Sequence, residues 1–204
     1  MSASELARAL LPPEEWPCGS KEDLIFGKIF EEEFALWRHL YERQLGGVKA
    51  RKFIAKVAQR LKAEGIYSRE MVLKAYRIAA AFIKAGVSGE TPKTGLFELD
   101  SEHGIFYKPD LEDYDNVYEL KTHPLTKFDE FQASIFALCV GKPVKLVGVE
   151  FDEKGMAHAQ MKVVKPFEDF GRLKEIIDSQ GETYEPPEED EDEYEEEDED
   201  EGMP

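Results

Sequence analysis

The chain has 204 residues, which suits one compact domain with an extension better than two full domains. Its 2 cysteines, Cys18 and Cys139, lie far apart, so the sequence excludes a disulfide framework and a zinc site built on paired cysteines. No stretch has the character of a membrane span or a signal peptide, and we expect a soluble, cytoplasmic protein.

Negative charge is concentrated near the C-terminus. The formal net charge is −18, but residues 182–201 hold 15 acids and no Lys or Arg, which leaves 29 acids against 26 bases elsewhere. Residues 181–204 contain almost no aliphatic side chains, so they cannot bury enough apolar surface to fold. We expect a disordered acidic tail there, whose charge suits a basic protein partner and would compete with nucleic acid for basic surfaces.

Positive charge predominates earlier in the chain. Between Arg38 and Lys84 there are 12 Lys or Arg and only 3 acids. Such a region is typical of a lobe that binds nucleic acid, although Lys and Arg also suit an ordinary solvated helix surface. We divide the chain into an N-terminal arm (1–21), a helical lobe (22–92), a core (93–180) and the acidic tail (181–204).

The arm contains a short predicted helix at residues 5–11, and the lobe contains three longer ones. The first begins at the capping pattern of Ser20 and runs to about residue 45, and the others span about 48–64 and 68–84. Their outward basic side chains are predicted to bind nucleic acid: Lys49, Lys52, Lys56, Arg60, Arg69, Lys74 and Arg77. Tyr67 and Tyr76 could stack on unpaired bases, although aromatic residues at helical spacing more often belong to a core.

The first long helix carries three consecutive acids. At 100° per residue Glu33 falls inside the apolar stripe, whereas Glu31 points away and Glu32 lies near the edge. A carboxylate on a buried face is costly unless it is paired or binds a metal, so Glu33 is the predicted site residue and the other two are alternates. The three acids could also simply compensate the helix dipole.

The core begins with three predicted strands, at about 94–99, 104–110 and 117–121, which would form an antiparallel meander. The turn 111–116 would place Asp110 opposite Val117 and diagonal to Glu119, with Glu119 and Lys121 on one face. Acids this close resist ionising together, and a divalent cation with oxygen ligands is the usual remedy. The alternative is an exposed hairpin face with a weak surface ion pair.

The rest of the core predicts a mixed α/β fold. A helix is expected at 127–140, with Gln132 among its buried residues, either as a satisfied core amide or as part of a site. The apolar run 144–151 predicts a buried strand parallel to 117–121 through this crossover helix. A further strand at 157–164 and a last helix at 167–178 complete the fold.

Pro109-Asp110 followed by Glu119-Leu120-Lys121, with Gln132 on the next helix, resembles the signature of the PD-(D/E)XK nuclease superfamily. The order of elements over residues 22–165 is similar to the RecB-like branch, which includes lambda-type exonucleases and CRISPR-associated nucleases. The resemblance implies a restriction-endonuclease-like mixed β-sheet core flanked by helices. The chain lacks the cysteines that hold an iron–sulfur cluster in some of those relatives.

The resemblance also implies a metal-dependent reaction. Asp110, Glu119 and the Leu120 carbonyl would hold Mg²⁺ or Mn²⁺, which prefer oxygen ligands. Lys121 would orient the attacking water and stabilise the negative charge of the transition state.

Two further residues would support that site. Glu33 would complete the metal's ligands or support a second ion, and Gln132 would steady Lys121 or a bound water. The first helix of the family begins with Gly-x-x-x-acid, and Gly27 with Glu31 fits that spacing. The resemblance thus favours Glu31 where the apolar periodicity favours Glu33.

We therefore expect a divalent-metal-dependent nuclease, with DNA favoured over RNA as the substrate. An RNA-directed nuclease stays open because the phosphate chemistry is shared. The rival from another class is a non-catalytic nucleic-acid-binding or scaffold protein. The enzyme requires Asp110, Glu119 and Lys121 to converge, whereas a scaffold would leave them dispersed.

Overall fold

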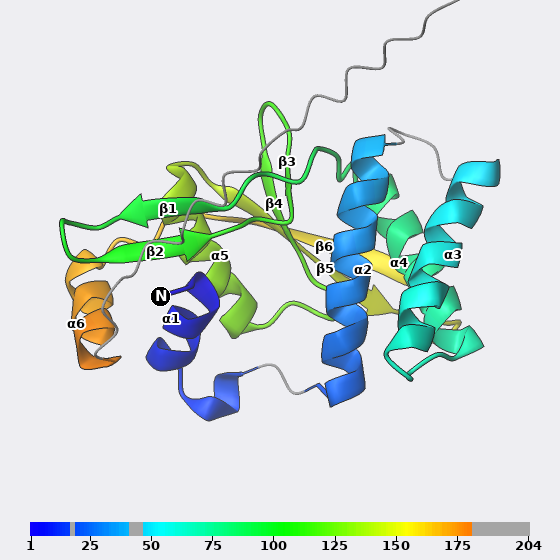
Figure 1. The fold of residues 1–204 in the computed structure, drawn as a ribbon, viewed down its shortest axis with the longest axis horizontal. Helices are drawn as coiled ribbons and strands as arrows, with labels where there is room; N and C mark the ends of the chain where they lie inside the picture. Colours follow the sequence, from blue (N-terminus) through cyan, green and yellow to red (C-terminus); the bar gives the residue numbers. More distant parts are fainter. Residues whose placement is uncertain (17–18, 41–46, 181–204) are drawn as a thin grey trace, which may run out of the picture.

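The computed structural model describes residues 1–16, 19–40 and 47–180 (Figure 1). The side chains of residues 39, 40 and 47–49 also lie outside the description. The predicted acidic tail, Cys18 and the predicted end of the first long helix fall outside these residues. Within the described ranges, none of the helices combines the length and the apolar character that a membrane span requires.

The helices form close to the predicted positions, because polar side chains cap their first turns. Ser68 caps α4, and Thr126 forms a capping box with Asp129 at the start of α5. Gly141, at φ 69°, ends α5 in the left-handed conformation. The helices are α1 (Ala3–Leu10), the 3-10 turn η1 (Pro13–Glu15), α2 (Lys21–Leu40), α3 (Gly47–Ala63), α4 (Arg69–Lys84), α5 (Lys127–Val140) and α6 (Phe170–Gln180).

The strands form two sheets. One contains β1 (Gly95–Glu98) and β2 (Gly104–Tyr107), and the other has the order β3 (Leu111–Glu112), β4 (Val117–Leu120), β5 (Val144–Phe151) and β6 (Ala157–Val164). β4 and β5 are parallel, with Val117 opposite Val144, and α5 makes the crossover between them. The predicted mixed α/β fold and its parallel crossover are confirmed.

The predicted three-stranded meander is wrong. β2 ends at Tyr107 and forms a two-stranded sheet with β1, with one further bridge to Ser2, and a new short strand, β3, pairs with β4 so that Leu111 lies opposite Tyr118. Pro109 explains the break, because proline has no N–H to donate to a sheet ladder. Asp110 therefore lies in the bend between β2 and β3, and the register of β3 and β4 directs it toward Glu119 rather than Val117.

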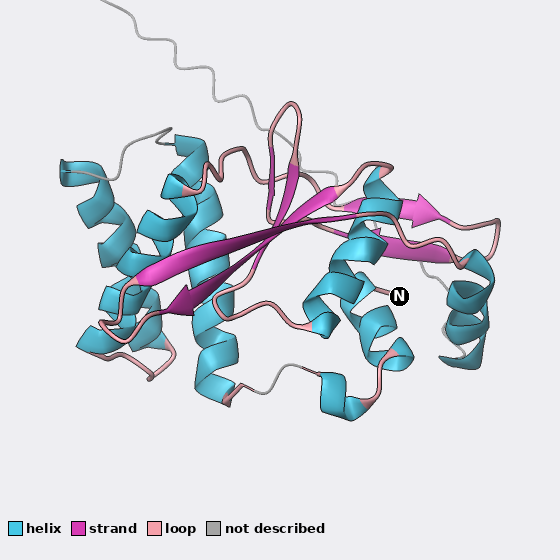
Figure 2. Cartoon of the chain, turned by 180° about the vertical axis from the view of Figure 1, so that it is seen from behind, coloured by secondary structure: helices cyan, strands magenta, loops and turns pink. Residues whose placement is uncertain are grey.

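Helices cover both faces of the four-stranded sheet (Figure 2). Tyr118, Leu120 and Val147 pack into an apolar cluster with α2, α3 and α4. Val117 and Leu146, on the other face, pack with α1, α5 and α6. β4 is buried along its whole length, so it is the element at which the two apolar clusters meet.

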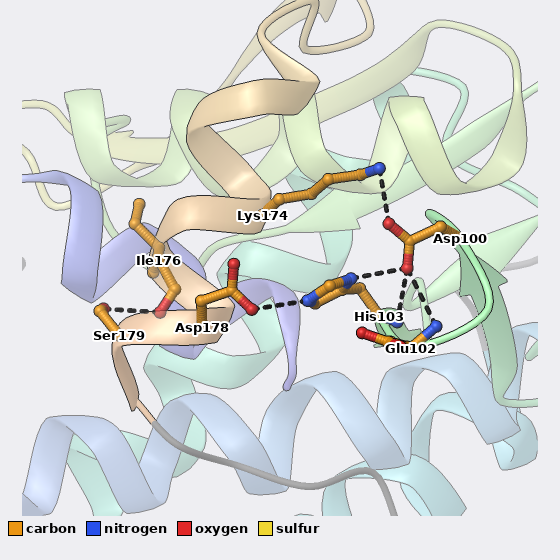
Figure 3. Close-up of polar contacts among 7 residues, drawn as sticks. All are labelled: Asp100, Glu102, His103, Lys174, Ile176, Asp178 and Ser179. Carbon is orange, nitrogen blue, oxygen red and sulfur yellow. Dashed lines mark hydrogen bonds and ion pairs between the residues drawn. The ribbon is translucent and has the colours of Figure 1, made fainter.

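The last helix is tied to the β1–β2 turn by a histidine between two carboxylates (Figure 3). His103 Nδ1 lies 2.6 Å from Asp100 Oδ1, and Nε2 lies 2.8 Å from Asp178 Oδ1 in α6. Lys174 Nζ lies 2.6 Å from the second oxygen of Asp100. Hydrogen bonds with Asp178 and Asp100 raise the pKa of His103, because both ring nitrogens donate only in the imidazolium form.

We predict that this contact stabilises α6 in a pH-dependent way. The folded pKa of His103 lies above its unfolded value of about 6.5, so its contribution is complete below about pH 6.5 and is lost as the pH rises through the raised pKa. Hydrogen exchange of the α6 amides, corrected for intrinsic rates, should show less protection at about pH 8.5 than at about pH 6. His103→Gln should remove this difference.

His158→Gln is the matched control, because His158 pairs with Asp152 in another part of the chain, 3.0 Å away. It should leave the exchange of α6 unchanged. The same pH dependence of α6 in His103→Gln as in the parent would contradict the prediction.

Candidate functional site

The candidate residues come from the bend at Asp110, from the end of β4, and from α2, which is far from both in the sequence. β4 carries Glu119, and Lys121 follows directly after it; the Lys121 N–H donates to the Val147 carbonyl at 2.8 Å, so the ladder with β5 continues past the end of β4. Alternate residues of such a ladder share a face, so Glu119 and Lys121 project from the same side.

Asp110 is fixed to the backbone of the same strand. Its Oδ2 accepts a hydrogen bond of 2.7 Å from the Leu120 N–H. Leu120 stands between Glu119 and Lys121, so this bond places the Asp110 carboxylate beside both. Leu120 thus contributes a backbone donor to Asp110, and the predicted role of its carbonyl as a metal ligand stays a prediction.

Glu119 and Lys121 form a buried ion pair. Lys121 Nζ donates to Glu119 Oε1 at 2.7 Å, and the exposed fraction is 13% for the Lys121 side chain and 5% for the Glu119 side chain. The other carboxylate oxygen, Glu119 Oε2, is buried and has no hydrogen-bond partner among the described residues. Because an unpaired buried oxygen is costly, this position is suited to a proton or to a cation.

Glu31 of α2 joins this cluster. Charges on Lys121 and Glu119 both act on its carboxyl group. Gly27, one turn earlier, allows the close approach: a Cβ there would lie 3.3 Å from Thr122 Oγ1 and 3.9 Å from Glu31 Oε1. The Gly27-x-x-x-Glu31 spacing therefore places Glu31 against the chain that leaves β4.

The prediction that Glu33 faces the cluster is wrong. Glu33 Oε1 lies 3.3 Å from Arg60 Nη1, and Glu32 Oε2 lies 2.6 Å from Arg60 Nη2. Both acids are therefore directed toward α3. The periodicity misled because the broad apolar stripe of α2 packs against α3 and α4, and an acid inside that stripe meets a basic residue of the neighbouring helix.

The three carboxyl groups of the cluster resist ionisation together. Burial, followed by the charge on Glu31, raises the pKa of Asp110 to about 7. Burial also raises the pKa values of Glu119 and Glu31 to about 8, with added repulsion from Asp110 and Glu119 respectively. Burial opposes the charge on Lys121, but the surrounding carboxyl groups outweigh it and raise the pKa of its ammonium.

Comparison with known proteins adds nothing to this geometry. The chain matches no protein-family model, no curated protein and no solved structure.

Asp129 is a neighbour of the cluster that the sequence pattern did not single out. It is buried, and its negative charge adds to the repulsion felt by Glu31 and Glu119. His123 Nδ1 lies 3.8 Å from Asp129 Oδ2. The capping pattern Thr126-x-x-Asp129 was the available signal, but by itself it indicates only where a helix begins.

Gln132 is buried, as predicted, but it has a different partner. Its side-chain Nε2 donates to Ser4 Oγ in α1 at 2.6 Å. This bond joins α5 to the N-terminal helix, so the predicted contact of Gln132 with Lys121 is replaced by a link between two helices.

Within the described ranges, some basic side chains of the lobe pair with acids and others do not. Arg60 pairs with Glu32 and Glu33, and Lys74 Nζ lies 3.7 Å from Asp23 Oδ1. Lys52, Lys56 and Arg69 are exposed, Arg77 is half-buried beside a groove, and the side chain of Lys49 lies outside the description. Composition alone did not separate these two groups.

We predict that the cluster destabilises the metal-free protein. The pKa of Asp110 is about 3.9 in the unfolded chain and about 7 in the folded protein. Between these two pH values the folded protein binds more protons at Asp110 than the unfolded chain does, so the free energy of unfolding falls as the pH rises. Asp110→Asn removes this loss while the amide oxygen still accepts from the Leu120 N–H. The melting temperature of the metal-free variant at about pH 8 should equal or exceed that of the parent by up to roughly 5 °C.

Asp113→Asn is the opposing control. Burial opposes the ionisation of Asp113, but hydrogen bonds from Asn116 and other donors outweigh it and lower its pKa. Neutralising this carboxylate should therefore destabilise the protein at about pH 8. A clear decrease in melting temperature for Asp110→Asn would contradict the prediction and would show that Asp110 has a stabilising structural partner.

Proposed function

We propose that the chain is a divalent-metal-dependent nuclease of the PD-(D/E)XK type, which hydrolyses phosphodiester bonds in DNA. One observation carries the proposal. Asp110, Glu119 and Lys121, chosen from their spacing, converge at the end of one buried strand, and Glu31 of α2 joins them. A scaffold protein has no need for such an arrangement, which costs stability.

The fold supports the proposal at a coarser level. A parallel pair, β4 and β5, is joined by the crossover helix α5 and flanked by the antiparallel strands β3 and β6. This order suits the restriction-endonuclease-like core that the resemblance implies. Function still has to be argued from the site, because a fold alone does not define an activity.

The donor set of the cluster fits Mg²⁺ or Mn²⁺. Asp110, Glu119 and Glu31 offer hard carboxylate oxygens, and Glu119 Oε2 is a buried oxygen without a hydrogen-bond partner among the described residues. Among the described residues, no three His, Cys, Asp or Glu side chains are already placed closely enough to hold a metal ion together. Mg²⁺ does not require such a group, because it is usually bound through one or two carboxylates and keeps several waters.

Asp110 and Glu119 would hold the ion, with the Leu120 carbonyl as the third protein ligand. When bound, the ion supplies an acidified water and neutralises charge on the phosphate. The positive charge of the ion would also offset the repulsion among these carboxyl groups. Their pKa values would fall, because the metal binds the ionised forms.

Lys121 would act as a permanent hydrogen-bond donor. Its raised pKa keeps the ammonium charged at neutral pH, so it is unsuited to accept a proton. It is suited to orient the attacking water and to stabilise the extra negative charge of the transition state. Glu31 would orient the same water or complete the ligands of the ion.

We predict nuclease activity that requires a divalent cation. Purified full-length protein should cleave labelled single-stranded or duplex DNA with Mg²⁺ or Mn²⁺, and parallel RNA substrates test the rival specificity. Asp110→Ala, Glu119→Ala and Lys121→Ala should each lower the rate by about 100-fold or more while remaining folded. Cleavage that persists in all three variants, or no cleavage with any metal, would overturn the proposal.

Glu31→Gln and Glu33→Gln form a matched pair for the same assay. They differ by two positions on one helix, but only Glu31 faces the cluster, whereas Glu33 pairs with Arg60. Glu31→Gln should lower the rate by about 10-fold or more, and Glu33→Gln should stay within about 3-fold of the parent. The reverse order would exclude Glu31 from the site.

We also predict that metal binding strengthens with pH. Protons on Asp110, Glu119 and Glu31, with pKa values of about 7, 8 and 8, compete with the ion in the free protein. The Mg²⁺ concentration that gives half-maximal activity should therefore fall as the pH rises from about 6 to about 9. A Mg²⁺ requirement that does not change over this range would contradict the raised pKa values.

A further inference from the structure

A groove of about 450 Å³ lies between α4 and the start of β6, away from the cluster. Two strands of the sheet order separate the groove from Asp110, because β6 is the edge strand opposite β3. Small side chains from both elements line it, among them Ala80, Ala157 and Ala159, and Tyr76, Arg77 and Lys84 of α4 complete its wall. Its size is that of a pocket for a small ligand.

The groove carries positive charge that none of the described acids neutralises. Arg77 and Lys84 take part in no ion pair or side-chain hydrogen bond within the described part of the chain, and no described Asp or Glu lines the groove. His158 also lines it but is held by Asp152. In a chain with 44 acids and 26 bases, an unneutralised basic groove indicates an anionic ligand.

The guanidinium of Arg77 lies against the β5–β6 turn. Gly155 has φ 70°, and a Cβ there would lie 3.0 Å from Arg77 Nη1, so the guanidinium lies directly over the turn. Asp152 fixes this turn by accepting the N–H groups of Lys154 and Met156 on Oδ1, each at 2.8 to 2.9 Å. The Arg77 guanidinium therefore extends from α4 over an ordered turn.

Tyr76 supplies an aromatic face beside these cations. Its side chain is 42% exposed, whereas Phe30, Phe34 and Phe82 of the same lobe are fully buried. Alanine side chains next to it leave room for a flat ring to approach. An exposed aromatic ring with neighbouring Arg and Lys is the combination that binds an unpaired base and its phosphates.

We propose that this groove binds one nucleotide of a single-stranded nucleic acid, with the base against Tyr76 and the phosphates on Arg77 and Lys84. A duplex does not fit this chemistry, because its bases are already stacked on one another. The choice of ligand rests on the proposed function, and the inference adds that the substrate has an unpaired strand that contacts the enzyme away from the cleaved bond.

The test measures the binding of a fluorescein-labelled oligothymidylate of about 12 nucleotides by fluorescence anisotropy. EDTA is present so that no cleavage occurs. Tyr76→Ala should weaken binding by about 5- to 100-fold, and Tyr76→Phe should restore most of it, because stacking needs only the ring. Arg77→Ala should weaken binding and reduce the slope of log K against log salt by about 0.7. Photo-cross-linking of an iodouracil-substituted strand should label Tyr76.

Tyr114→Ala and Arg172→Ala are the matched controls. Tyr114 is 98% exposed in the β3–β4 turn, and Arg172 is an exposed arginine of α6, at the other end of the molecule from α4 (Figure 1). Both variants should bind like the parent. Thermal melting of the Tyr76 and Arg77 variants should match the parent, because neither side chain is fully buried.

The inference would be overturned by no binding of the strand by the parent, by equal binding by the Tyr76 and control variants, or by an equal loss of duplex and single-strand binding in Tyr76→Ala. A polyglutamate peptide could also compete with the oligonucleotide for the groove. If this competition is lost in Tyr76→Ala, an acidic peptide and not a nucleotide is the ligand, and the inference is overturned. Tyr76-dependent binding without any cleavage in Mg²⁺ or Mn²⁺ would support nucleotide binding in the groove and overturn the proposed nuclease activity. Cleavage together with binding that does not depend on Tyr76 would support the nuclease activity and overturn nucleotide binding in the groove.

Discussion

An electrostatic imbalance at the end of β4 is the constraint that the rest of the structure has to hold in place. One ammonium, Lys121, faces three carboxyl groups in a space largely removed from water. Free in solution these groups would separate. Here a buried strand, a bend anchored by the Leu120 N–H and a packed helix hold them in place. The rigidity of the two apolar clusters that meet at β4 therefore maintains an arrangement that its own charges oppose, as is typical of sites that bind an ion.

The position of α2 decides which acid can take part. Gly27 and Glu31 are one helical turn apart and share a face of α2. The segment that Gly27 contacts therefore also lies next to Glu31. Gly27 approaches Thr122 closely enough that a Cβ would stand only 3.3 Å from its hydroxyl oxygen. A glycine at this position therefore sets the depth at which α2 packs, and that depth brings Glu31 to the strand end.

The sequence predicts those parts of the fold that local signals determine. The capping box at Thr126 and the left-handed Gly141 define both ends of α5, and an apolar run after a helix indicates the parallel strand β5. Pairing between distant segments is less accessible, because the pairing of β4 with β3 rather than β2 depends on where Pro109 interrupts the ladder. The Glu33 prediction failed for a related reason. A helical wheel shows that a face is buried but does not show whether a basic residue such as Arg60 or the carboxyl cluster around Lys121 lies opposite it.

The same distinction applies to the positive surface of the lobe. Counting Lys and Arg treats every cation as available, yet Arg60 and Lys74 lie beside acids of α2. A cation already opposite a carboxylate contributes little to the attraction of a phosphate, because the field of the pair falls off faster than that of a single charge. The effective positive potential therefore belongs to side chains such as Lys52, Arg77 and Lys84, which form no ion pair with any residue that the structure describes. Two of these, Arg77 and Lys84, lie on α4 and line the groove at the start of β6, so the proposed contact with a nucleic acid strand is on the β6 edge of the sheet rather than on α3.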